Sequence, residues 1–187
     1  VADGLGMEAL PPAPPISVKP QDMPPSPALQ ITGKMKPTLQ GRCVGILIDD
    51  GSDAAAIAAL RKAAEAEGAQ VKIVAPKIGG AKLGNGKRLP ADGQLAGTPS
   101  VVFDAVALVL SDAAGKALAS EAAAVDWVRD AFGHLKAIAH DDGASAVIQA
   151  AGIGKDAGVV KASETAAFIK AAHTRQFARE SKVRTLP

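Results

Sequence analysis

The chain has 187 residues, enough for one domain with a tail or for two small domains, and only 3% are aromatic, so its core must consist of Ala, Val, Ile and Leu. The 21 basic and 19 acidic residues are spread along the chain, which excludes the concentrated basic stripe of nucleic-acid-binding proteins. No apolar stretch is long enough to span a bilayer, and the single cysteine, Cys43, is typical of a reducing compartment. We therefore expect a cytoplasmic protein with neither nucleic acid nor membrane as a partner.

Residues 1–40 are predicted to form an arm. Nine of the 13 prolines lie between Pro11 and Pro37, where they remove backbone donors and bias their neighbours toward extended conformations. Because the chain begins with Val1 rather than Met, we also expect a fragment or a processed form. We place the boundary of the packed domain, 41–187, directly after this arm.

Beyond residue 40 the sequence alternates between short apolar runs and helical periodicity. Each apolar run ends at turn residues, which is typical of strands buried on both faces of a parallel sheet. In chain order the predicted elements are a strand over 42–48, a helix over 54–67, a strand over 71–75, a hairpin over 82–89, a strand over 105–110, a long helix over 115–133, a strand over 135–139, a short helix over 144–151, a brief strand over 159–160 and a surface helix over 165–179.

Local signals support several of these boundaries. Ser52 or Asp53 can cap the first helix, and Gly68 can end it. The Gly-Asn-Gly sequence around Asn85 predicts the hairpin turn. The alternation predicts an α/β fold with an open, doubly wound, mostly parallel sheet and a hairpin insertion.

Acidic residues follow the predicted strands at the sheet edge where ligands bind in open α/β folds. The strand ends carry Asp49 and Asp50, then Ser111 and Asp112, then His140, Asp141 and Asp142. One interpretation is a divalent-cation or phosphoryl site, in which Lys161 would complete an arrangement similar to that of a response-regulator receiver. The other is that these residues cap helices and form turns, which alone predicts Asp and Ser here. We favour the second and expect no metal site.

The segment His140-Asp141-Asp142 also stands where a hydrolase would carry its nucleophile. Such a strand-to-helix elbow needs Cys or Ser at its tip. Cys43 is expected to be a buried apolar residue inside the first strand, and Ser145 to lie within the helix that follows the elbow. We therefore predict a degenerate elbow without a catalytic residue.

Several segments resemble the carboxy-terminal domain of large-subunit haem catalases. The resemblance covers essentially the whole chain, and the segments that carry it most clearly are 1–6, 25–29, 41–51, 91–106 and 136–143. The resemblance implies a flavodoxin-like fold of the class I glutamine-amidotransferase-like superfamily, which includes the ThiJ/PfpI proteins. It also implies that the first of these segments is the end of a catalase core.

The same resemblance assigns the positions that carry the superfamily's chemistry. Active members have a cysteine at the elbow and a glutamate early in the first helix. Here Asp141 stands at the cysteine position and Ala56 at the glutamate position. Both departures remove the groups that an amidotransferase-like or protease-like reaction would use.

The resemblance also implies haem chemistry for the parent enzyme, which disproportionates hydrogen peroxide. Catalases of this type bind iron through a tyrosinate and use a distal histidine and asparagine. This chain contains no tyrosine, and its one asparagine, Asn85, lies in a predicted turn. We expect no cofactor in this chain and haem in the parent core only.

Two classes of function remain from the sequence. The first is a non-catalytic domain that stabilises the parent tetramer through the catalase core and protects unfolding client proteins, using either an exposed apolar patch or the arm. For the arm, with Met23, Leu29, Ile31 and Met35, a plain tether is the explanation that we favour. The second is a small-molecule or metal-binding enzyme or sensor at the acidic strand ends.

Overall fold

The computed structural model describes residues 2–183 and divides into two units between Ile31 and Thr32. Within the described part of the first unit, the 3-10 turn Asp3–Leu5 is the only helix, and no residue is in a strand. This backbone agrees with the proline-rich arm, while Val1 lies outside the described residues. The predicted boundary after residue 40 stays a prediction, and Leu39 is completely buried in the core of the second unit.

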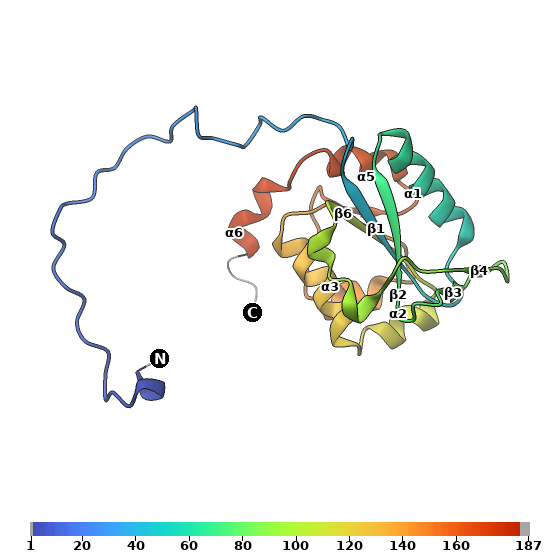
Figure 1. Cartoon of the computed structure of the whole chain (residues 1–187), viewed down its shortest axis with the longest axis horizontal. Coiled ribbons are helices and arrows are strands. Elements are labelled where there is room, and N and C mark those ends of the chain that lie inside the picture. The colour runs from blue at the N-terminus through green and yellow to red at the C-terminus, as the bar shows by residue number, and fades with distance from the viewer. Residues whose placement is uncertain (1, 184–187) are drawn as a thin grey trace. The chain divides into compact units, whose positions relative to one another are not determined.

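The second unit is built on a six-stranded, entirely parallel sheet (Figure 1). Its strand order is β5-β2-β1-β6-β7-β8, and a separate antiparallel pair joins β3 to β4. The strands are β1 (Cys43–Ile48), β2 (Gln70–Ala75), β3 (Ala81–Lys82), β4 (Arg88–Leu89), β5 (Gly93–Gln94), β6 (Ala105–Val109), β7 (Ile138–His140) and β8 (Val159–Lys161). The predicted α/β fold with a parallel sheet and a hairpin insertion is confirmed.

Helices cover both faces of this sheet. They are α1 (Ala54–Ala66), α2 (Asp112–Leu118), α3 (Ala122–Gly133), α4 (Ser145–Ala150), α5 (Thr165–Ala172) and α6 (Glu180–Val183). Three short 3-10 turns accompany them in the second unit, at Leu95–Gly97, Ser100–Val102 and Phe177–Arg179. Side chains of α1 and α5 pack in one core, and those of α2, α3 and α4 pack in another.

The alternating directions of the side chains along β1 explain why there are two cores, one on each face of the sheet. Val44, Ile46 and Ile48 pack with α1 and α5, whereas Leu47 belongs to the core with α2, α3 and α4. Successive side chains of a strand point to opposite faces, so a central parallel strand needs apolar residues at nearly every position. Gly45 is part of this packing, because a Cβ there would lie 2.5 Å from the ring of Phe103.

The long helix predicted over 115–133 is wrong, because α2 ends at Leu118 and α3 begins at Ala122. The N–H groups of Ser120 and Glu121 each bond to a carbonyl three residues back, which tightens and ends α2. No proline or glycine marks this break. It is instead where two separate helices each bury an apolar stripe in the same core.

The strand predicted over 135–139 begins later, at Ile138. Leu135 has a φ of 58°, and the N–H groups of Leu135 and Lys136 bond to the carbonyls of Phe132 and Ala131. This pattern is a Schellman motif, in which the residue after the helix cap adopts the left-handed conformation, so Leu135 closes α3 rather than starting a strand.

Other boundaries differ in smaller ways. Asp53, not Ser52, caps α1, since its Oδ1 accepts from the N–H of Ala55. The predicted helix over 165–179 ends at Ala172, and strand β5 was not predicted at all. The structure confirms the helix end at Gly68, whose φ is 82°.

Candidate functional site

The carboxyl ends of β1 and β6 are adjacent in the sheet, where an open α/β fold offers its ligand crevice. Two serine hydroxyls connect the loops at this position. The buried Oγ of Ser52 accepts from the N–H of Asp49 at 2.9 Å and lies 2.6 Å from the carbonyl oxygen of Val109. The Oγ of Ser111 donates to the carbonyl of Asp50 at 2.8 Å, so the two loops are joined directly.

The two carboxylates that follow β1 accept hydrogen bonds from backbone N–H groups. Asp49 Oδ1 accepts from the N–H of Asp50 at 2.8 Å, and Asp50 Oδ1 accepts from the N–H of Lys82 in β3 at 2.7 Å. Asp112 lies in the first turn of α2, which Ser111 caps through the N–H of Ala114. Within residues 2–183, no group of three or more His, Cys, Asp and Glu side chains could hold a metal ion.

The elbow after β7 brings Asp141 to the strand next to it. Its Oδ2 accepts from the N–H of Leu110 at 2.8 Å and its Oδ1 from the N–H of Ala144 at 3.0 Å. The carboxylate therefore connects the end of β6 to the start of α4. Burial raises the pKa of the Asp141 carboxyl, although the two backbone N–H groups and His140 act in the opposite direction.

The two neighbours of Asp141 are held differently. His140 is 9% exposed, and its Nδ1 lies 2.9 Å from the carbonyl oxygen of Asp141. Asp142 is exposed and forms an ion pair with Lys161 of β8, whose ammonium lowers the pKa of the Asp142 carboxyl. The structure thus pairs Lys161 with Asp142 at the elbow. The receiver-like interpretation instead required Lys161 to join the carboxylates that follow β1.

Close backbone contacts leave little room at the elbow tip. A Cβ at Gly143 would lie 1.9 Å from the carbonyl oxygen of Leu110, and a Cβ at Gly115 of α2 would lie 1.8 Å from that of Gly143. Both distances are far below any real carbon–oxygen contact. Ala56, predicted from the sequence to stand at the glutamate position, lies in the first turn of α1 and packs against the core with its methyl group.

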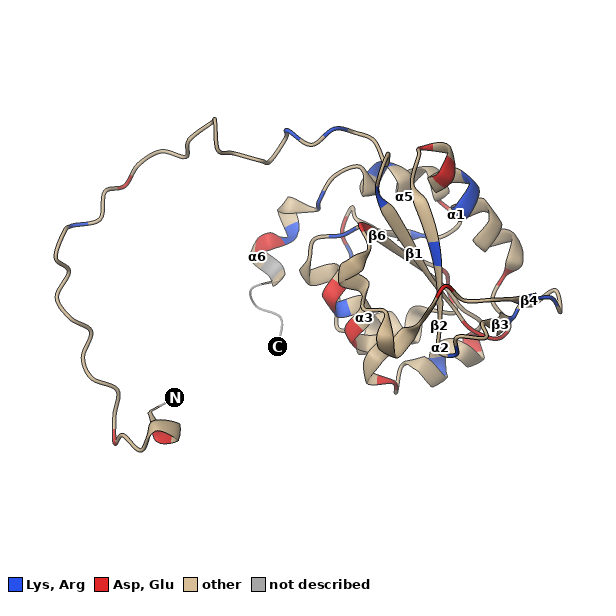
Figure 2. Cartoon of the chain, viewed as in Figure 1, with Lys and Arg blue, Asp and Glu red and all other residues tan. Residues whose placement is uncertain are grey.

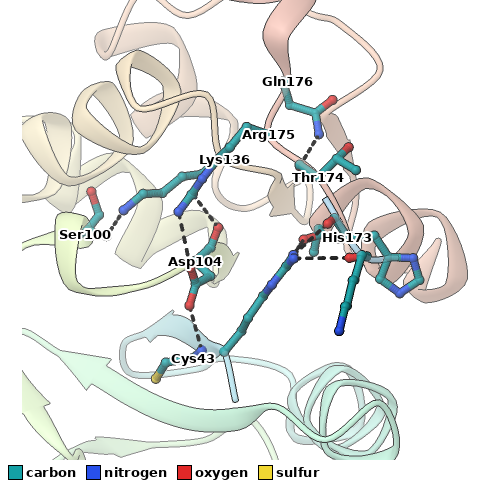
Figure 3. A network of polar contacts seen from close by, with 11 residues as sticks. Cys43, Ser100, Asp104, Lys136, His173, Thr174, Arg175 and Gln176 are labelled. Atoms are coloured by element: carbon teal, nitrogen blue, oxygen red, sulfur yellow. Dashed lines mark hydrogen bonds and ion pairs between the residues drawn. The ribbon is translucent and has the colours of Figure 1, made fainter. Parts of the chain in front are cut away.

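A polar network at the opposite, amino-terminal edge of the sheet was not foreseen (Figure 3). Arg175 donates to the carbonyl and to Oδ1 of Asp104 at 3.0 and 3.2 Å, while Asp104 Oδ2 accepts from the N–H of Cys43 at 3.0 Å. Lys136 is 3% exposed and donates to the carbonyl of Ser100 at 2.7 Å. Burial, reinforced by the nearby Arg175, lowers the pKa of the Lys136 ammonium to about 8.

Cys43 differs from its expectation, since it begins β1 and is only partly buried. Burial is the main cause that raises the pKa of its thiol. A sequence signal for part of the network exists in hindsight, although none marks Arg175: Arg42 and Asp104 directly precede β1 and β6, and Lys136 lies two residues before β7. Arg42 donates to the carbonyls of Ala172 and His173.

The segment after α5 is held by a buried arginine. Arg179 is 1% exposed and forms two hydrogen bonds with the carboxylate of Asp156, at 2.6 and 2.8 Å. It also donates to the carbonyl of Lys136 at 2.9 Å and stacks over the ring of Phe132, 4.0 Å from its centre. The network and this pair together attach the last described turns to the amino-terminal edge of the sheet.

Charged side chains of both signs alternate over the second unit (Figure 2). No helix among residues 2–183 is long and apolar enough to cross a membrane.

Comparison with known proteins identifies the family of the chain. Residues 40–176 match the family described as the C-terminal domain found in long catalases. The chain is 41% identical over 175 residues to Catalase C of Rhizobium meliloti, covering 90% of this chain and 25% of that protein. It is 34% identical over 160 residues to Catalase HPII of Pseudomonas aeruginosa, covering 86% of this chain and 22% of that protein. The chain thus spans about a quarter of the length of these relatives.

Solved structures share the fold at low identity. Oxidized DJ-1 of Toxoplasma gondii superposes with a TM-score of 0.57 at 14% identity, covering 76% of this chain and 96% of that one. A ThiJ/PfpI domain protein from Brachyspira murdochii superposes with a TM-score of 0.58 at 13% identity, covering 72% and 95%. These likenesses confirm the flavodoxin-like fold of the class I glutamine-amidotransferase-like type. With the match over residues 40–176, they show that the chain belongs to the family of C-terminal domains of long catalases.

Proposed function

We propose that this chain is a non-catalytic domain of a long catalase that stabilises the parent enzyme and protects unfolding proteins in a chaperone-like manner. The observation that carries the non-catalytic part is the state of Asp141. Its two carboxylate oxygens both accept backbone N–H groups, from Leu110 and Ala144, at the position where active superfamily members carry a nucleophile. A carboxylate used in this way supports the fold and attacks no substrate.

The packing around the elbow supports the same proposal. A substrate carbonyl would need space and free N–H donors beside the nucleophile. Here the N–H of Leu110 is occupied by Asp141, and the approach of Gly143 to the Leu110 carbonyl fills the space next to it. Ala56 supplies no carboxylate from α1. A hydrolase of the amidotransferase or protease type is therefore the weaker candidate.

Haem chemistry belongs, in this proposal, to the remainder of the parent protein. The relatives that match the chain are catalases, and the chain covers about a quarter of their length. It has no tyrosine that could bind haem iron as catalases of this type do. The catalase core is accordingly the proposed partner of this domain.

The arm is the part of the chain that would contact unfolding proteins. Many of its large apolar side chains are exposed, with exposed fractions from 37% to 82%. They are Leu5, Met7, Leu10, Ile16, Val18, Met23, Leu29 and Ile31. Exposed apolar side chains in an extended, proline-rich segment can bind the apolar surface of another protein without first being freed from a core.

Heat-induced aggregation of an unrelated, heat-labile enzyme tests this role. We expect light scattering to fall as the chain is added, and to recover when Ile16, Val18 and Met23 are all replaced by Ser. The matched control replaces Lys19, Gln21 and Asp22 by Ser in the same segment and should protect as well as the unchanged chain. Equal scattering with and without the chain, at every excess, would exclude the chaperone-like role.

A further inference from the structure

A cavity of about 480 Å³ lies between α4, the edge strand β8 and the loop that connects them. Its size falls within the range of small-molecule pockets in proteins. Its lining residues all come from residues 140–164, so it is separate from the loops that follow β1 and β6. Nothing in the proposed function uses it.

The walls of the cavity combine apolar side chains with a few polar groups. The apolar lining consists of Ile148, Ile153, Val159 and Val160. The uncharged polar lining consists of His140, Ser145 and Gln149. A mostly apolar pocket with a small number of polar groups is the usual composition of a site for an amphipathic organic molecule.

His140 indicates that an occupant of the cavity should carry a hydrogen-bond donor. Its Nδ1 lies 2.9 Å from the carbonyl oxygen of Asp141, which can only accept, so Nδ1 carries the hydrogen. In the neutral ring Nε2 is then an acceptor, and within residues 2–183 no side chain or N–H group donates to it. His140 is 9% exposed and lines the cavity, so an occupant of the cavity can supply that donor.

The charges around the cavity cancel. Lys161 is paired with Asp142. The remaining lining charges are one cation, Lys155, and one anion, Glu164, and within residues 2–183 neither forms an ion pair with another residue. A cavity with balanced charge and apolar walls offers no net attraction to an ionised ligand, and desolvating such a ligand there would cost free energy.

We propose that this cavity is a binding site for a small uncharged molecule with an apolar body and one hydroxyl or amide N–H donor. The apolar body packs against Ile148, Ile153 and Val160, and the donor bonds to Nε2 of His140. This role is independent of the arm and of the elbow carboxylate. It would give the domain a ligand of its own beside any contact with the catalase core.

A matched set of benzyl compounds tests the proposal on the whole chain. Benzyl alcohol carries the donor, benzyl methyl ether keeps the oxygen without it, and benzoate and benzylamine carry opposite charges. Amide chemical shifts in ¹H–¹⁵N spectra give the affinity and the place of binding. We expect benzyl alcohol to shift the amides of residues 145–161 saturably and to bind roughly tenfold more tightly than the ether, since the ether leaves the imidazole acceptor without a donor.

Two variants separate the cavity from general surface binding. His140→Phe should reduce the preference for the alcohol over the ether to about one, whereas His134→Phe, at an exposed position, should leave it unchanged. Ile148→Trp fills the cavity without touching the histidine and should abolish binding of both compounds. Equal affinity for alcohol and ether in the unchanged chain, tighter binding of either ion, or no saturable shift of these amides would overturn the proposal.

Discussion

Replacing Arg179 by Met should destabilise the domain more than almost any other single change at a charged residue. The substitution keeps the aliphatic stem but removes a guanidinium that is 1% exposed and makes two hydrogen bonds to Asp156. It also takes a donor from the carbonyl of Lys136 and a cation from the face of Phe132. Breaking one side of a buried ion pair costs about 3–5 kcal/mol, because the remaining charge loses its opposite charge in a poorly solvated place. Asp156 would keep the N–H of Gly158 on its Oδ1.

That cost is a large part of the stability of an ordinary domain, which totals about 5–15 kcal/mol. Urea unfolding followed by tryptophan fluorescence measures it directly, because the chain has one tryptophan and no tyrosine. Trp127 is 2% exposed in α3 and packs edge-to-face on Phe103, with ring centres 6.1 Å apart, so its emission reports global unfolding. The matched control is Arg88→Met in the hairpin, where the exposed guanidinium makes one bond to the carbonyl of Gly79.

The control should change the free energy of unfolding by less than about 0.5 kcal/mol. The variant Asp156→Asn, and its combination with Arg179→Met, complete a double-mutant cycle in which the two positions should couple by more than about 1 kcal/mol. A loss below about 1 kcal/mol for Arg179→Met, or additive effects in the cycle, would refute the reasoning that the buried pair holds the last described turns on the domain.

Three further changes test the edges of the sheet. Lys136→Met should remove a pH dependence of stability. The pKa of Lys136 is about 8 in the folded chain and 10.5 in the unfolded chain, so between these pH values the unfolded chain binds more protons. The stability of the wild type should therefore rise from pH 8 to 10.5 by on the order of 3 kcal/mol relative to the variant. Gly143→Ala should destabilise by more than about 2 kcal/mol in urea, because its Cβ would meet the Leu110 carbonyl at 1.9 Å. Ser52→Ala should cost about 1–3 kcal/mol in thermal unfolding, since it leaves the Asp49 N–H without its acceptor.

Gly97→Ala is the control for Gly143→Ala, since it places a Cβ in open space and should be close to neutral. The difference in stability between wild type and Lys136→Met could also stay constant from pH 8 to 10.5. That result would contradict the claim that burial lowers the pKa of Lys136. Neutral effects at Gly143 or Ser52 would mean that the elbow and the loops that follow β1 and β6 are held by other contacts than those described.

The strands that the sequence predicted best are those with continuous apolar runs. In β1 and β6 the burial on both faces demands Val, Ile, Leu and Ala at nearly every position, so the pattern itself defines the strand. The helix end at Gly68 was also predictable, because glycine tolerates the left-handed conformation that ends a helix. These features depend on residues close together in the chain.

The features that the sequence did not predict depend on tertiary contacts. The end of α3 at Gly133 agrees with the prediction, but Leu135 adopts a left-handed conformation that leucine disfavours, so the local sequence did not show that β7 begins only at Ile138. Strand β5 consists of Gly93 and Gln94, two residues with low strand propensity that pair with the end of β2. The break between α2 and α3 likewise follows from packing in the shared core rather than from propensity.

The candidate site shows the same division. The acidic residues at the strand ends are plain in the sequence, but their hydrogen bonds to the backbone of neighbouring loops appear only in three dimensions, as for Asp50 with Lys82 and Asp141 with Leu110. The amino-terminal network joins Cys43, Asp104 and Arg175, which are far apart in the chain. Such contacts carry no sequence period by which they could be recognised.

We propose that this chain acts without catalysis of its own. Haem titration of the chain, followed by a hydrogen peroxide consumption assay on the same sample, is the experiment to perform first. We expect no shift of the haem Soret band and no peroxide loss above that of free haem. Stoichiometric haem binding with rapid peroxide consumption would contradict it, because a chain without tyrosine would then be supplying a catalase site.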